Sequence, residues 1–266
     1  MQKPCNYLPL SLFIVLLTTF SYSQIQSQQK PKPILPLSPL MTVLRTEFLF
    51  LNFNWELGIA YSENSNRPKL NEEVLEDFEE WLQRKPRKEV IERITEYNLA
   101  LKYKENIKEI FSDLSLIGNK TGMFLYDDTV EIPIRFAQKE NKIVFIVTRV
   151  GSDNVFNTLR TTSKTRAAEI ISSMILPEMR SFYDSFKGTD IKYYGMIIAY
   201  GSKNFLEESK VLDLKPEIVA LIVSAENCKK FTEGLITEDE MIELSDIYLK
   251  DRDMLTGIKK TKITLE

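Results

Sequence analysis

Apolar side chains recur at helical spacing in two long stretches of the chain. Across residues 71–116, apolar positions such as Phe78 lie three or four residues apart, and Asn71 precedes two glutamates, as is typical of a helix N-cap. Residues 163–186 carry the pattern of the longest single helix, with Pro177 inside it. Proline removes a backbone donor from a helix, so we expect this long helix to be kinked.

Other stretches have the pattern of strands. Residues 130–136 alternate between apolar and polar side chains, and Pro133 favours an edge position. Glu140 and Asn141 follow as a hairpin turn. The remaining strands are predicted from apolar runs: 143–150, 191–200 and 218–223 lack a polar face, whereas 247–249 and 258–265 are weaker edge candidates.

The order of these elements predicts the fold class. We expect an α+β protein with a mixed or largely antiparallel sheet, the long kinked helix 163–186 on one face and the N-terminal helices packed on the other. Residues 43–122 are the mainly helical region and 123–266 the α+β region, together one compact unit. The aromatic-rich stretch 42–61 fits either a buried strand or an irregular packing segment.

The N-terminus has the pattern of a secretory signal peptide. Residues 1–23 contain Lys3, an apolar run, and small residues at Ser21 and Ser23 that suit a cleavage site. An uncleaved anchor is the alternative. Residues 24–42, rich in Pro and Gln, read as a linker. We therefore expect an exported chain, periplasmic or secreted, with no transmembrane segment after cleavage and with Cys228 as its single cysteine, hence without an internal disulfide.

The amino-acid composition excludes several catalytic and binding chemistries. The 266 residues include no histidine, which excludes Ser-His-Asp and Cys-His catalysis and metal sites that use histidine. Lysine and arginine number 35 and aspartate and glutamate 38, without a basic region, so we do not expect nucleic acid as a partner. The sequence has neither a phosphate-binding loop nor a dinucleotide-binding glycine motif, so we expect no cofactor.

Some histidine-independent chemistry stays open. Serine and lysine are adjacent at residues 163–164, 202–203 and 209–210, and acids are paired at 127–128 and at 251 and 253. Turn, cap and cation-binding roles compete with catalysis at these positions, and we expect no metal. Cys228 adjoins two lysines, although a buried structural thiol is the simpler interpretation.

The start of the long helix is the candidate binding site. Arg160, Lys164 and Arg166 cluster there with Thr162 and Ser163, although acids are the favoured residues at a helix N-terminus. Cations, hydroxyls and backbone N–H groups together suit phosphate, sulfate or carboxylate. Pairing with neighbouring acids, or simple exposure, is the alternative.

Two functions follow from these observations. The first is an exported, non-catalytic binding or interaction protein, whose partner is an envelope protein or a small anionic ligand. The alternative is a hydrolase that uses paired carboxylates or a Ser-Lys pair.

Overall fold

The computed structural model describes residues 36–56, 72–84, 91–125, 132–205, 215–250 and 257–264, and residues from Pro36 onward belong to one compact unit. Its helices are α2 (Leu40–Glu56), α3 (Glu72–Gln83), α4 (Ile91–Lys102), α5 (Lys104–Thr121), α6 (Ser163–Ile170), the π-helical turn η1 (Ile171–Ile175), α7 (Leu176–Phe186), α8 (Ala225–Thr232) and α9 (Glu238–Glu243). Its strands are β1 (Met123–Leu125), β2 (Ile134–Lys139), β3 (Lys142–Asn157), β4 (Ile191–Lys203), β5 (Lys215–Ser224), β6 (Asp246–Lys250) and β7 (Lys259–Thr261).

The described strands form one seven-stranded sheet in the order β1-β3-β4-β5-β6-β7. Strand β3 is long enough to pair with two partners along one edge, β2 at its start and β1 nearer its end. Its other edge pairs with β4 in parallel, and the remaining pairs are antiparallel. The expected α+β class with a largely antiparallel sheet is therefore confirmed.

Local turn and cap chemistry explains where two elements of the fold begin or end. Glu140 and Asn141 both have positive φ, 52° and 59°, as a two-residue hairpin turn between β2 and β3 requires. Thr237 and Glu240 form a reciprocal capping box at the start of α9. The hairpin turn agrees with the prediction from sequence.

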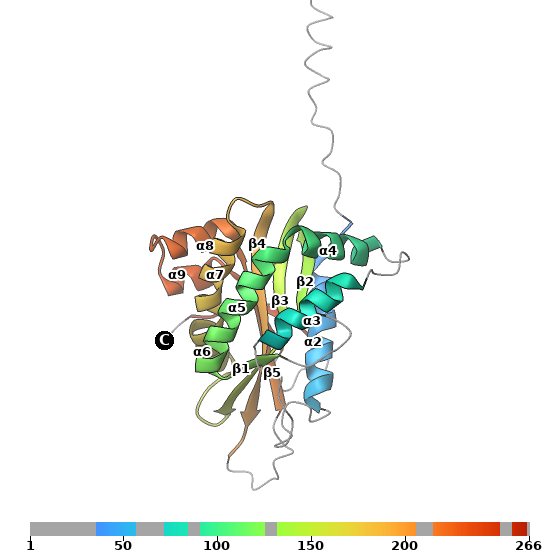
Figure 1. The fold of residues 1–266 in the computed structure, drawn as a ribbon. Coiled ribbons are helices and arrows are strands. Elements are labelled where there is room, and N and C mark those ends of the chain that lie inside the picture. Colours follow the sequence, from blue (N-terminus) through green and yellow to red (C-terminus); the bar gives the residue numbers. More distant parts are fainter. Residues whose placement is uncertain are drawn as a thin grey trace, which may run out of the picture. The chain divides into compact units, whose positions relative to one another are not determined.

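Helices α5 and α7 lie together on one face of the sheet (Figure 1). Aromatic rings fill the layer beneath them, with Phe145 of β3 in edge contact with Phe136 and Phe182. Phe186 of α7 contacts Tyr103, which lies at the junction of α4 and α5. The aromatic layer thus joins the N-terminal helices to the long helix.

Helix α2 packs on the opposite face, against β2, β3 and β5. Its buried residues Leu40, Leu44, Phe48 and Leu51 lie three or four apart and contact the inner positions of the sheet. Stretch 42–61 was expected as a strand or irregular segment; its described part is helical, because these side chains share one helical face. Helix α5, which we expected opposite the long helix, packs on α7 instead.

The long stretch 163–186 is helical throughout, as α6, η1 and α7 in succession. The π-helical turn Ile171–Ile175 immediately precedes the first turn of α7, which holds Pro177. Proline lacks the N–H of a regular helix and its ring crowds the preceding turn, so a wider turn there accommodates it. The chain crosses from β3 to the parallel strand β4 through this helix.

In the described part of the chain, no helix is long and apolar enough to cross a membrane. The predicted signal peptide (residues 1–23) lies outside the described residues, and so does most of the predicted linker. Helix α2 begins at Leu40, within the last residues assigned to that linker.

Candidate functional site

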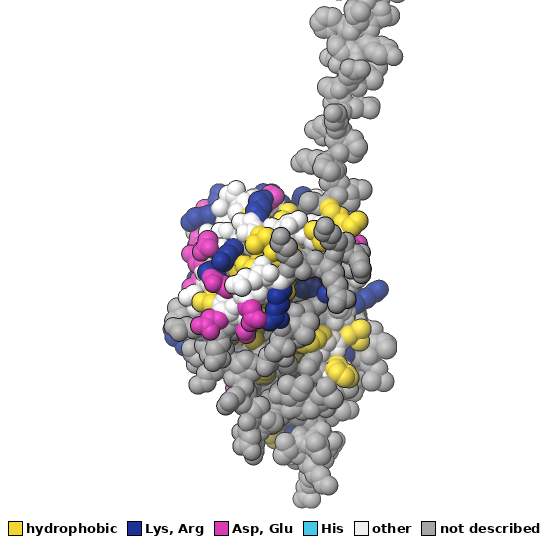
Figure 2. Space-filling view, turned by 45° about the vertical axis from the view of Figure 1, so that its right-hand side comes forward, with side chains coloured by type: hydrophobic (Ala, Val, Ile, Leu, Met, Phe, Trp, Pro, Cys, Tyr) yellow, Lys and Arg dark blue, Asp and Glu magenta, His cyan; other side chains and the backbone are white. Residues whose placement is uncertain are grey.

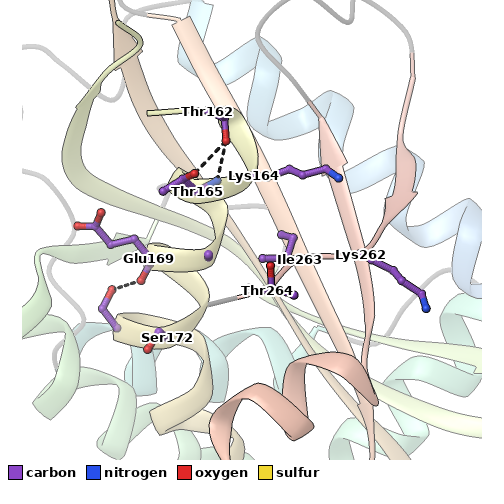
Figure 3. Close-up of a pocket in the computed structure, with 10 residues that line it drawn as sticks. Thr162, Lys164, Thr165, Glu169, Ser172, Lys262, Ile263 and Thr264 are labelled. Atoms are coloured by element: carbon purple, nitrogen blue, oxygen red, sulfur yellow. Dashed lines mark hydrogen bonds between the residues drawn. The ribbon is translucent and has the colours of Figure 1, made fainter. Parts of the chain in front are cut away.

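A pocket of about 510 Å³ lies where α6 and η1 meet the segment that follows β7. Its lining residues are Thr162, Lys164, Thr165, Ala168, Glu169, Ser172, Ser173, Lys262, Ile263 and Thr264 (Figure 3). Ile263 is buried and fixes the C-terminal segment, while Lys262 and Thr264 beside it are exposed. The pocket therefore has an apolar floor and a polar rim.

Thr162 sets the position of the pocket's helical wall. It adopts extended backbone as the N-cap of α6, and its hydroxyl accepts a hydrogen bond from the Thr165 N–H at 3.2 Å. The hydroxyls of Thr162 and Thr165 also lie 2.9 Å apart (Figure 3). This cap is the local reason why α6 begins here.

The charged side chains of the pocket are separated by sign. Lys164 and Lys262 extend to one side of α6 and Glu169 to the other (Figure 3). Within the described residues, neither lysine forms an ion pair. The lining of the pocket thus includes two lysines from different elements of the fold.

The serines of the π-helical turn add polar groups with defined hydrogen bonds. Ser172 donates to the carboxylate of Glu238 on α9 at 3.0 Å, and Ser173 donates to the backbone carbonyl of Glu169 at 2.6 Å. Each hydroxyl oxygen keeps lone pairs for a further donor. Because these serines donate to oxygen and not to a lysine amine, the geometry does not provide the activated serine of a Ser-Lys hydrolase.

The five residues predicted for anion binding have different environments. Thr162 and Lys164 line the pocket, and Ser163 lies between them on α6. Arg160 is exposed in the turn before the helix and is not among the lining residues. Arg166 is buried, with 4 % of its surface exposed.

Arg166 is engaged within the protein. Its Nε donates to Glu217 of β5 at 2.9 Å, its Nη2 donates to the second carboxylate oxygen, and its Nη1 donates to the carbonyl of Thr161. These hydrogen bonds occupy the guanidinium N–H groups that we expected to bind an external anion. The acid that compensates Arg166 is thus Glu217, 51 residues away along the chain.

Sequence reasoning missed the C-terminal wall of the pocket. Residues 258–265 were interpreted as a weak edge strand, and β7 does pair with β6 there. Lys262 and Thr264 follow that strand and reach α6 only through the tertiary fold. The lysines within residues 259–262 are a sequence signal for a basic surface, but no local pattern shows that they lie near residue 164.

The other candidate chemistries are placed as follows. Cys228 is buried in α8, and burial raises the pKa of its thiol, which disfavours the reactive thiolate. Ser202 is buried in β4 beside Lys203. The carboxylates at 127–128 and at 251 and 253, and the pair 209–210, lie outside the described residues. Within the part that is described, no group of acids and cysteine is arranged to hold a metal ion.

Lys and Arg side chains intermingle with Asp and Glu side chains on the described part of the face drawn in Figure 2. Such a mixture is typical of a solvated surface. Comparisons of the chain with protein-family models, with curated proteins and with solved structures find no match. The functional argument therefore rests on the pocket and its residues.

Proposed function

We propose that this chain is an exported, non-catalytic binding protein whose ligand is a small anion, held in the pocket between α6 and the C-terminal segment. The observation that carries the proposal is the pair of lysines, Lys164 and Lys262, which line a 510 Å³ pocket from elements far apart in sequence and extend to the same side of α6 (Figure 3). Two ammonium groups without an ion pair among the described residues attract negative charge.

The hydroxyl groups of the pocket support the same ligand chemistry. Thr165, Ser172 and Thr264 bring hydroxyls to the lining. Hydroxyls and ammonium groups together suit phosphate, sulfate and carboxylate oxygens. Glu169 is also a lining residue, but its carboxylate extends to the other side of α6 from the lysines (Figure 3).

The π-helical turn gives independent support for a site at this position. Ser172 and Ser173 belong to η1, and single π-helical turns occur frequently at functional sites. Ser172 donates to Glu238 and Ser173 to the carbonyl of Glu169, so these two serines do not form a Ser-Lys pair.

Calorimetry and NMR titration with inorganic phosphate, sulfate and citrate test the proposal. We expect millimolar or tighter binding of at least one of them, weakened at least tenfold in the double variant Lys164→Gln, Lys262→Gln. Lys187→Gln is the matched control, since Lys187 is an exposed lysine at the end of α7 that pairs with Asp184. Absence of binding at 10 mM of each anion, or equal affinity in the double variant and the control, refutes the anion site.

Export is a separate part of the proposal and has its own measurement. The pattern of residues 1–23 supports it, together with the prediction of a chain without disulfides that is stable through its core. Mass spectrometry of the secreted or periplasmic fraction is expected to show a mature chain that starts near Gln24. Recovery of the intact chain from the membrane fraction contradicts cleavage and favours the anchor.

A further inference from the structure

Helix α7 carries a carboxyl group into the core. Glu178 has no exposed surface (0 %), and it lies one turn before Phe182, whose ring packs on Phe145 of β3. Among the described residues, neither carboxyl oxygen of Glu178 has a hydrogen-bond partner. An ionised carboxylate without donors is strongly disfavoured in such a place, whereas the neutral acid is tolerated far better.

A second carboxyl group lies close to Glu178 across the helix interface. Asp113 of α5 accepts a hydrogen bond from Ser181 of α7 and acts electrostatically on Glu178. Burial, reinforced by the charge of Asp113, raises the pKa of Glu178 to about 8. Two carboxylates at this interface would repel each other as well as lose hydration.

Most cations of the surrounding helices contact other groups. Lys104 and Lys108 of α5 pair with Glu79, and on α8 Lys229 pairs with Glu233 and Lys230 with Glu226. Arg180 of α7 lies over the ring of Phe231, and Lys120, in the last turn of α5, is exposed. Helix α5 also carries Glu105 and Glu109, both exposed, and η1 carries no ionisable side chain. Asp113 is therefore the charged neighbour that matters for Glu178.

We propose that the interface between α5 and α7 is a proton-dependent clamp, closed while Glu178 carries a proton and loosened when its carboxyl group ionises. The neutral acid lets α7 pack against α5 with Glu178 inside. The ionised form needs water, which it reaches when the two helices separate locally.

The direction of the pH dependence follows from proton linkage. A glutamate ordinarily titrates near 4.5, and Glu178 in the folded chain titrates near 8, so folding takes up a proton between these values. The stabilisation from this group is complete below pH 4.5 and is lost as the pH rises through 8. Within that window, Glu178 raises the unfolding equilibrium constant about tenfold per pH unit.

Denaturant unfolding of the wild type and of Glu178→Gln between pH 5 and pH 9 tests the linkage. We expect the ratio of the two unfolding constants to change about tenfold per pH unit and to level off above pH 8, because glutamine cannot ionise. Asp184→Asn, at an exposed carboxyl group of the same helix, is the control and should follow the wild type. In the Asp113→Asn background, the ratio of the two unfolding constants should level off at a lower pH, since the charge that repels the Glu178 carboxylate is removed. Parallel curves for the wild type and Glu178→Gln overturn the proposal.

Two measurements on the folded protein separate ionisation from opening. Carbon-13 NMR of the Glu178 carboxyl group should show a titration midpoint well above 4.5, and a midpoint near 4.5 overturns the proposal even if the variant does not fold. In the wild type, amide hydrogen exchange in α5 and α7 should accelerate between pH 7 and pH 9 by more than the intrinsic pH dependence of exchange. In Glu178→Gln it should follow the intrinsic dependence alone. Equal exchange in both proteins overturns the clamp.

Discussion

Removal of the carboxylate of Glu47 should destabilise the fold more than most single substitutions. Glu47 is fully buried on the inner face of α2, and its carboxylate accepts hydrogen bonds from Arg135 Nη1 at 2.8 Å and from Arg149 Nε at 3.3 Å. Arg149 is itself buried, lies over the ring of Phe50 at 4.0 Å, and adopts a positive φ of 61° in β3. Because non-glycine residues rarely adopt this backbone conformation, the surrounding contacts must hold Arg149 there.

The expected magnitude follows from charge and burial. Two unit charges about 4 Å apart attract by about 4 kcal/mol at the effective dielectric constant of a protein, and Glu47 has two such partners. Desolvation offsets part of this attraction, but removal of one partner leaves buried charge uncompensated, at a cost of about 3–5 kcal/mol. Arg135 also pairs with Glu96 at 3.1 Å, so part of its charge stays compensated when Glu47 is replaced.

A double-mutant cycle of Glu47→Gln and Arg149→Gln measures this coupling by denaturant unfolding. We expect a loss of about 3–5 kcal/mol for Glu47→Gln, and a loss in the double variant smaller than the sum by at least ~1.5 kcal/mol. Glu80→Gln is the matched control, because Glu80 pairs with Arg84 on an exposed helical surface, and it should change stability by less than ~0.5 kcal/mol. A loss below ~1 kcal/mol for Glu47→Gln, or additive losses, would show that the buried network does not hold α2 on the sheet.

Two further substitutions test the other layers of the fold. Ile175→Ala, at a fully buried position in the π-helical turn, should cost about 2–5 kcal/mol in denaturant unfolding, whereas a loss below ~1 kcal/mol would place the helix at the periphery of the core. Glu217→Gln should cost about 3–5 kcal/mol by leaving Arg166 buried beside a neutral amide, and a neutral outcome would mean that Arg166 relaxes to solvent and is available to an anion after all.

Most elements of the fold could be predicted because their determinants are local. Alternation, apolar runs and a two-residue turn are enough to predict the β2–β3 hairpin, although the strand expected at 130–136 is observed at Ile134–Lys139. Helix α2 was harder, because the aromatic density of residues 48–55 obscured the spacing of Leu40, Leu44 and Leu51 that defines its buried face. The side of the sheet that each helix covers was not predictable, since it depends on contacts such as that of Tyr103 with Phe186.

The candidate site was also predictable only where its determinants are close together in the sequence. Clustered hydroxyls and cations marked residues 160–166, and Thr162 and Lys164 do line a pocket. The role of Arg166 is decided by Glu217 on β5, and the second lysine comes from the C-terminal segment. Pairings across the sheet determine which cations of a cluster face solvent, so composition alone could not separate Lys164 from Arg166.

Buried acids connect these arguments, because each one must be compensated by a cation or by a proton. In the described part of the chain, Glu47, Glu178 and Glu217 are buried, and two of them face arginines. A guanidinium stays charged at every pH at which the protein folds, so arginines compensate the charge of Glu47 and of Glu217. Glu178 has Asp113 as its charged neighbour instead of a cation, and its compensation is the proton that it carries. A pH response above neutrality is therefore expected to arise at the α5–α7 interface, where the compensating group is a proton that Glu178 can lose.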